Sequence, residues 1–167
     1  MIRSAKEARY LGWQLSTIVF LLCLAADTPQ GHCGETRLNG HLFTLPDGYE
    51  IEHVAGPPLV NRPISADFDD RGRLYVTDSS GSNENVKLQL EKRPHRIVRL
   101  EDSDSDGVFE KGTVFAEGLM FPEGALWHDG SFYVAAPPQI WKFTDIDDDG
   151  VCDKREVWFD GKTLTGC

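Results

Sequence analysis

The chain has 167 residues, of which 40% are hydrophobic and 10% aromatic, so it is long and apolar enough for one folded domain with a packed core. Lysine and arginine number 17 against 27 aspartates and glutamates, which gives a formal net charge of −10. This balance excludes a surface built to neutralise nucleic-acid phosphates or to dock on anionic lipid, and it makes cations the natural partners of the chain.

The N-terminal residues have the pattern of an export signal. Residues 1–16 carry three basic side chains, and the apolar run from Leu15 to Ala26 follows. That run is short for a membrane span, which needs about 20 residues, and it ends in small residues. We expect residues 1–26 to be a cleaved signal peptide, with an uncleaved anchor as the alternative. The chain is then periplasmic, associated with the cell envelope, or secreted.

Export also decides how the cysteines are interpreted. Cys33, Cys152 and Cys167 remain after the signal, and because three is an odd number, one of them has no partner within the chain. Which two form a disulfide stays open. No C-x-x-C pair and no C-x-x-C-H sequence occurs, so we expect neither a zinc site nor a haem site in this chain.

The segment after the signal is polar. Residues 27–41 are rich in glycine and polar side chains, and we expect them to form a linker. Residues 42–45 and 49–54 have the composition of strands, with Pro46-Asp47-Gly48 as the turn between them. The sequence Gly56-Pro57-Pro58 then interrupts any regular structure.

The second part of the chain repeats itself. Residues 97–102 align with residues 140–145, which lie 43 positions later, and residues 72–76 align with 130–134 at a distance of 58. The 15 additional residues fit an insertion in the first unit, within which residues 83–92 are polar. We expect this insertion to be a surface excursion that contains one or two helical turns.

Each unit has the pattern of four short strands. The predicted strands are 64–68, 73–77, 96–100 and 113–116 in the first unit, and 124–127, 131–135, 139–143 and 156–159 in the second. Four strands in a period of about 43 residues match one blade of a β-propeller. We therefore predict an all-β fold in which residues 42–167 form about two blades of an incomplete propeller of the six-bladed type, with units at about 63–120 and 121–167. A β-sandwich is the alternative, although it does not require a repeat.

Two blades do not close a propeller, which usually has about four to eight. We therefore expect the chain to be a fragment of a longer protein. Five aromatic side chains are expected to pack between the units: Trp127, Trp141, Trp158, Tyr75 and Tyr133. The five histidines lie far apart in the sequence and are expected at the surface or at sheet edges.

The sharpest motif runs from Asp145 to Glu156. It places carboxylates at positions 1, 3, 5, 9 and 12 and glycine at position 6, which is the spacing of a calcium-binding loop. Calcium prefers six to eight hard oxygen ligands, and alternate residues of a tight loop direct three aspartates to one point. The candidate ligands are Asp145, Asp147, Asp149, the carbonyl of Val151, Asp153 and Glu156.

A related loop begins at Asp102, at the same point of the first unit. Its candidate ligands are Asp102, Asp104, Asp106, the carbonyl of Val108 and Glu110. Position 12 is Thr113, a poor substitute for glutamate, so weaker binding is expected there. The alternative for both loops is a solvated acidic turn, because aspartate and glycine are ordinary turn residues. The repetition of the pattern, with like charges that repel unless they are neutralised, favours calcium.

No catalytic residue is predicted. The chain contains neither a G-x-S-x-G sequence nor a phosphate-binding loop, and no pair of side chains has the pattern of a general acid and base.

Several segments together resemble a known family. They are 45–49, 54–58, 69–76, 94–97 and 121–124, together with the two D-x-D-x-D-G loops. In these motifs the chain resembles the membrane-bound dehydrogenases of the sorbosone-dehydrogenase-like type found in planctomycete-type bacteria. Those proteins are similar in turn to soluble quinoprotein sugar dehydrogenases. The resemblance covers about residues 42–167.

The resemblance implies a six-bladed propeller that holds pyrroloquinoline quinone (PQQ) and oxidises a sugar or an alcohol. It also implies a downstream cytochrome c domain as electron acceptor. In the family an Asn-Asp-Leu-His stretch follows a sequence like Thr165-Gly166-Cys167, so no catalytic residue is transferred to this chain. Two other functions stay open: a non-catalytic scaffold that binds protein or polysaccharide, and a calcium-dependent lactonase.

Overall fold

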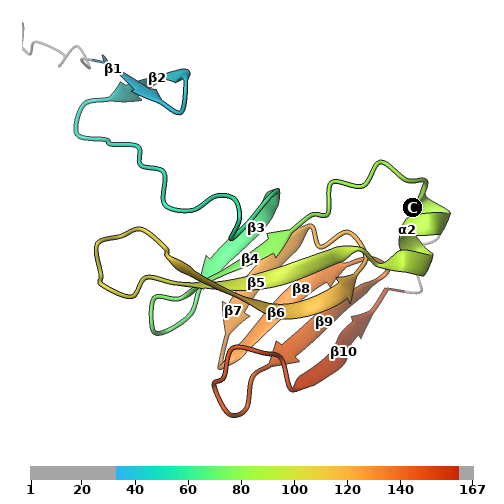
Figure 1. Cartoon of the computed structure of the whole chain (residues 1–167). Helices are drawn as coiled ribbons and strands as arrows, with labels where there is room; N and C mark the ends of the chain where they lie inside the picture. Colours follow the sequence, from blue (N-terminus) through green and yellow to red (C-terminus); the bar gives the residue numbers. More distant parts are fainter. Residues whose placement is uncertain (1–32, 162–167) are drawn as a thin grey trace, which may run out of the picture. The chain divides into compact units, whose positions relative to one another are not determined.

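The computed structural model describes residues 33–161, and about half of these residues lie in β-strands (Figure 1). The expected signal peptide at 1–26 and the sequence Thr165-Gly166-Cys167 lie outside the described residues. The fold is all-β with several antiparallel sheets, as the sequence predicts. The chain divides into two compact units between Glu52 and His53. No helix of the described part is long and apolar enough to cross a membrane.

The first unit contains a β-hairpin whose position differs from the one predicted. Strand β1 (Cys33–Leu38) pairs antiparallel with β2 (His41–Pro46) across the turn Asn39-Gly40, whose φ angles are 49° and 81°. Asn-Gly favours the positive φ angles that a two-residue hairpin requires. The expected linker at 27–41 therefore contains a strand, and residues 49–54, expected as a strand, contain none.

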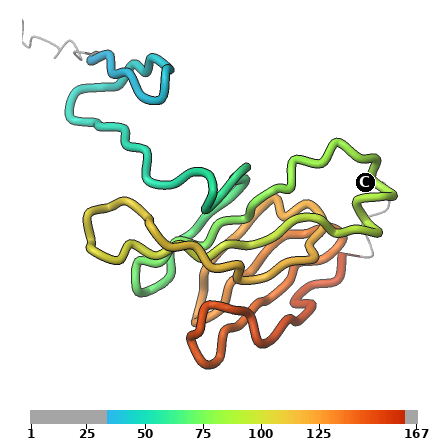
Figure 2. The backbone as a smooth tube through the Cα atoms, viewed as in Figure 1, coloured from blue at the N-terminus to red at the C-terminus, as the bar shows by residue number. Residues whose placement is uncertain are grey.

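The second unit contains two four-stranded sheets, each built from consecutive strands (Figures 1 and 2). The first sheet has the order β3 (Pro63–Phe68), β4 (Leu74–Asp78), β5 (His95–Glu101) and β6 (Lys111–Leu119). The second has the order β7 (Gly124–His128), β8 (Ser131–Ala136), β9 (Gln139–Thr144) and β10 (Lys154–Asp160). All eight predicted strands of the two units are confirmed, with shifted ends.

The excursion between β4 and β5 contains the helix α2 (Val86–Lys92), in agreement with the one or two turns expected there. The Asn85 side chain caps the helix by accepting the Leu88 N–H at 3.1 Å. Arg93 ends it in the left-handed conformation, with φ of 45°.

His95, expected at the surface or at a sheet edge, is instead only 2% exposed. Its Nδ1 accepts the Ser80 N–H at 3.1 Å, and its Nε2 lies 3.2 Å from Oε1 of Gln89, a buried residue of α2. The centroids of the His95 and Phe121 rings lie 5.4 Å apart. The imidazole therefore ties the start of the excursion and its helix to the first sheet.

The main core lies between the two sheets. Tyr75, which is fully buried, places its ring 4.9 Å from Phe115, 4.9 Å from Trp127 and 5.2 Å from Phe132. Trp127 and Trp141 pack against this core, as the sequence predicts. Trp158 does not, since it is 62% exposed.

The opposite face of the first sheet has a core of its own. Val76, Val98 and Leu100 pack there beneath the segment 54–60, together with Phe109. The N–H of Phe109 donates to the carbonyl of Val54 at 2.9 Å. Both faces of the first sheet are thus covered within the second unit.

Polar contacts fix the two sheets relative to each other. The Cys152 N–H donates to the Phe115 carbonyl at 2.8 Å, and the Trp127 N–H donates to Oδ2 of Asp67, also at 2.8 Å. Arg155 donates to the carbonyl of Glu117 at 2.6 Å. Two of these bonds join strands of the two sheets, and the third holds the loop between β9 and β10 against β6, so they decide the surroundings of the second acidic loop.

Candidate metal sites

The two acidic loops occupy equivalent places in the two sheets. The first loop, residues 102–110, joins β5 to β6, and the second loop, residues 145–153, joins β9 to β10 (Figure 1). Each therefore connects the third strand of its sheet to the fourth.

The two loops also share a backbone conformation. Ser105 and Asp148 hold equivalent positions, and each has a φ of 64°. Gly107 and Gly150 are equivalent as well, with φ of 92° and 97°. At this φ an L side chain is strained, so glycine at position 6 permits the turn that brings the preceding aspartates together.

In the first loop, the carboxylates organise the backbone. Asp102 accepts the Ser105 N–H at 2.7 Å through Oδ1 and the Gly107 N–H at 2.9 Å through Oδ2. Asp106 accepts the Val108 N–H at 2.8 Å. One carboxylate oxygen from each of four residues lies within 4.8 Å of the others: Asp102, Asp104, Asp106 and Glu110. All four are candidates from the sequence.

The second loop repeats this arrangement with three carboxylates. One oxygen from each of Asp145, Asp147 and Asp149 lies within 4.8 Å of the others. Asp145 accepts the Gly150 N–H at 2.9 Å through Oδ2, and Asp149 accepts the Val151 N–H at 2.7 Å. Hard carboxylate oxygens at this spacing are the ligands that calcium prefers.

The remaining candidates lie outside these two groups. Asp153 accepts the Ile146 N–H at 2.7 Å. Its equivalent in the first loop, Glu110, makes the same bond with the Ser103 N–H at 3.0 Å but belongs to the first group. Glu156 lies on β10 and pairs with Lys154 at 3.0 Å. Val108 and Val151 follow the turn glycines, and their N–H groups bind the aspartates at position 5.

Hydrogen bonds and ion pairs favour the charged form of two loop carboxyls. The N–H groups of Gly107 and Ser105 hold the pKa of Asp102 below its ordinary value. The guanidinium groups of Arg73 and Arg71 do the same for the pKa of Asp148, which does not belong to either group of converging oxygens.

Three arginines at the second loop were not predicted from the sequence. Arg99 of β5 donates to Asp145 at 3.1 Å, and both side chains are buried, with 4% and 5% of their surface exposed. Arg73 pairs with Asp148 at 2.7 Å, and Arg71 pairs with the same carboxylate. These residues lie 46 or more positions from their partners, so no local spacing reveals them.

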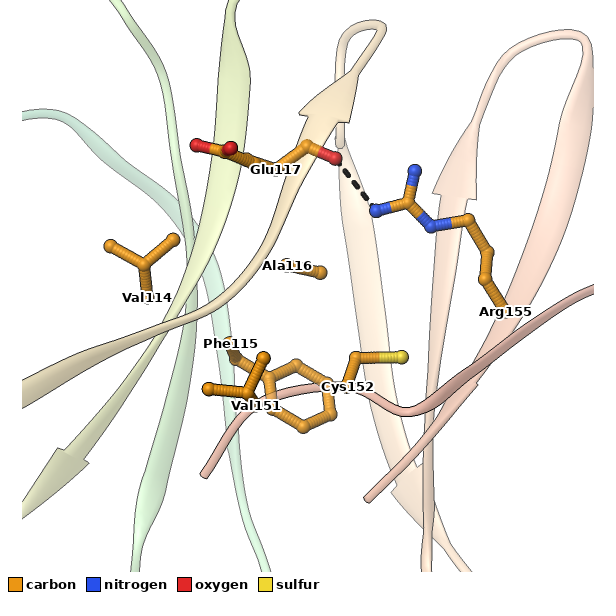
Figure 3. A pocket seen from close by; sticks show the side chains of 7 residues that line it. All are labelled: Val114, Phe115, Ala116, Glu117, Val151, Cys152 and Arg155. Carbon is orange, nitrogen blue, oxygen red and sulfur yellow. Dashed lines mark hydrogen bonds between the residues drawn. The ribbon is translucent and has the colours of Figure 1, made fainter. Parts of the chain in front are cut away.

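Three cavities lie on the second unit, along its sheets and loops. One, of about 390 Å³, is lined by Val114, Phe115, Ala116, Glu117, Val151, Cys152 and Arg155 (Figure 3). A second, of about 550 Å³, is lined by Gly124, Ala125, Leu126, His128, Tyr133, Ala135, Ile140 and Trp158. The third, of about 320 Å³, lies against residues 53–59 and 108–110. The first holds the free thiol of Cys152, whose pKa is raised by burial.

Comparison with known proteins places the chain in a family. No curated protein and no solved structure matches it. The family described as a domain of unknown function, DUF7133, matches residues 38–165, which include both sheets and both acidic loops. The chain therefore belongs to the DUF7133 family.

Proposed function

We propose that this chain is an exported, calcium-binding part of a β-propeller, and that the propeller belongs to a PQQ-dependent sugar or alcohol dehydrogenase of the sorbosone-dehydrogenase-like type. One observation carries the calcium part of the proposal. The same acidic loop, with the same backbone conformation, joins the third and fourth strands in both sheets.

The stacking of the two sheets supports the propeller. Each sheet is a four-stranded meander, and the two are equivalent in sequence at the offsets of 43 and 58. Val76, Val98 and Leu100, on one face of the first sheet, correspond to Val134, Trp141 and Phe143, with which the second sheet meets the first. The sheets therefore stack in the same orientation, front on back, as neighbouring blades do.

The other face of the second sheet is available to a further blade. The buried residues through which the first sheet meets the second are Tyr75, Ile97 and Phe115. Their equivalents, Tyr133, Ile140 and Trp158, line the cavity of about 550 Å³. A third sheet of the same repeat, packed on this cavity, would continue the stack.

The donor set of the loops fits calcium. All the converging ligands are carboxylate oxygens, and no described histidine or cysteine belongs to either group. Hard oxygen ligands favour Ca²⁺ over softer metals. In an exported protein such sites usually bind calcium at about 10⁻⁴–10⁻³ M and stabilise the fold.

Calcium binding is tested by thermal unfolding of the chain. At a calcium concentration of about ten times Kd, each occupied loop should raise the melting temperature by roughly 3–6 °C. The double variant Asp147→Asn with Asp149→Asn should lose the part of this rise that comes from the second loop. The double variant Asp104→Asn with Asp106→Asn should lose the part that comes from the first loop. Asp129→Asn, in an exposed turn outside both groups, is the control and should keep the full rise. A parent chain whose melting temperature does not change when calcium is added would contradict the proposal.

The quinone part of the proposal rests on the family resemblance. PQQ is a tricarboxylate, and binding it requires several cationic or polar partners. Of the three cavities described above, the first contains one arginine, Arg155, and the other two contain one histidine each, His128 and His53, as their cationic or potentially cationic side chains. These cavities do not fit the quinone, so no step of its chemistry is assigned to residues of this chain.

The dehydrogenase part is tested by reading the coding DNA past codon 167. Further units of about 43 residues, an Asn-Asp-Leu-His stretch and a C-x-x-C-H sequence are expected, whether in frame or after one frameshift. A stop codon followed by unrelated sequence would contradict the dehydrogenase and would leave a small exported calcium-binding module.

A further inference from the structure

The two acidic loops differ at one oxygen atom. In the first loop, Oδ1 of Asp102 accepts the Ser105 N–H at 2.7 Å. The equivalent oxygen, Oδ1 of Asp145, is buried and has no hydrogen-bond partner in the described structure. Because the backbone φ angles of the loops agree, the difference comes from the residues that surround the second loop.

Arg99 is the neighbour that distinguishes the second loop. It belongs to the first sheet, and it donates to Oδ2 of Asp145 at 3.1 Å and to Glu101 at 2.8 Å. A Cβ atom on Gly150 would lie only 2.3 Å from Nη2 of Arg99, so the guanidinium lies directly against the turn. Among the described residues, no arginine pairs with a carboxylate of the first loop.

The free oxygen points to a ligand. A buried carboxylate oxygen without a partner is costly, and native structures rarely leave one in this state. Asp145 belongs to the group whose oxygens converge within 4.8 Å, and its side chain is only 5% exposed. A cation held by Asp147, Asp149 and this oxygen would supply the missing partner.

We propose that Arg99 is a positioning residue for a calcium ion in the second loop: it holds Oδ2 of Asp145 and leaves Oδ1 for the metal. The inference rests on the proposed calcium function and deepens it. One carboxylate then bridges the guanidinium and the calcium ion through different oxygens. Because the guanidinium comes from the other sheet, calcium binding in the second loop is coupled to the contact between the sheets.

The charges around the loop permit this arrangement. The positive charge of Arg99 is paired with Glu101, so it does not face the metal uncompensated. Arg73 and Arg71 pair with Asp148, which lies outside the ligand group. Asp145, Asp147 and Asp149 therefore keep a net negative charge toward the ion. Orientation of a ligand by an outer partner of this kind typically contributes about 10–100-fold to metal affinity.

The first loop has no such coupling. It joins two strands of one sheet, and its carboxylates bind N–H groups of the same loop. Its affinity for calcium should therefore not depend on Arg99. The first loop serves as a reference site within the same molecule, because it reports whether a variant is folded.

Calorimetric titration of calcium into the whole chain tests the proposal. The second loop is isolated by Asp104→Asn with Asp106→Asn, and the first by Asp147→Asn with Asp149→Asn. In the chain with only the second loop intact, Arg99→Gln should weaken calcium binding about 10-fold or more. In the chain with only the first loop intact, the same substitution should leave the affinity unchanged. Arg71→Gln, which breaks an exposed pair at the second loop, is the matched control and should also have no effect.

Two results would overturn the inference while leaving the calcium function standing. One is that the second loop binds calcium equally well after Arg99→Gln. The other is that it binds calcium more tightly, which would show that Arg99 competes with the metal. A parent chain that binds no calcium in either loop would instead overturn the proposed function and this inference with it.

If Arg99→Gln prevents folding, a comparison of two glycine substitutions tests the role of Arg99 instead. Gly150→Ala and Gly107→Ala introduce the same side chain at nearly the same positive φ. Only the first displaces Arg99, since a Cβ on Gly107 meets nothing within 4 Å. Gly150→Ala should therefore weaken its own loop more than Gly107→Ala weakens the other. Equal losses in the two loops would contradict the role of Arg99.

Discussion

Two aspartates at equivalent positions of the acidic loops have different neighbours in the structure. Asp102 and Asp145 hold the same position of the same loop, and both bind the turn glycine five residues later. Only Asp145 meets an arginine from the neighbouring sheet. The loop spacing predicts the ligands, whereas the partner of a ligand depends on which side chains the sheet stacking brings to it.

His95 gives a testable prediction at the scale of single residues. Burial lowers the pKa of its imidazole, and Nδ1 accepts a hydrogen bond from Ser80, which a protonated ring cannot do. The folded chain therefore favours the neutral ring, while in the unfolded chain the pKa is about 6.5. The stability from this site should be fully present above pH of about 6.5 and should be lost as the pH falls below it.

Denaturant unfolding at a series of pH values between about 7.5 and 5.5 measures this effect. The free energy of unfolding should fall toward the acid end, and His95→Gln should flatten the slope. His128→Gln, at an exposed histidine, is the control and should keep the slope of the parent. A parent chain whose stability is constant over this range would contradict the prediction.

At the scale of elements, the strands of the two sheets could be predicted, because each is a short run of apolar and β-branched residues bounded by turn signals. The hairpin of the first unit could not. Its strand β1 is polar, with the sequence CGETRL, so its composition resembles that of a linker. The signal that could have found it is the turn Asn39-Gly40, which carries the two positive φ angles of a tight hairpin.

The candidate site was predictable to the same extent. Alternating aspartates before a glycine predict converging oxygens, and the structure brings seven of the candidate carboxylates into two groups. Glu156 differs, because its strand β10 begins at Lys154, before the twelfth position of the loop, and its side chain pairs with that lysine. Spacing alone does not reveal where a strand begins to fix its side chains.

At the scale of the whole molecule, the repeat makes a comparison between equivalent residues possible. Phe115 and Trp158 are related by the 43-residue offset and lie on the same face of their sheets. Phe115 is 1% exposed because the second sheet covers it, whereas Trp158 is 62% exposed. If stacking of the same kind continues beyond the second sheet, Trp158 fills in the larger protein the role that Phe115 fills here.

This equivalence predicts two different results for one kind of substitution. In the chain itself, Phe115→Ala should lower the free energy of unfolding by about 3–5 kcal/mol, as expected for a buried aromatic side chain. Trp158→Ala should change it little, because the ring already contacts solvent. In a polypeptide that carries the next four-stranded unit, Trp158→Ala should become about as costly as Phe115→Ala. Chemical denaturation of the four variants gives the comparison. An equally small effect of Trp158→Ala in both settings would show that no further sheet packs on this face, and it would contradict the propeller.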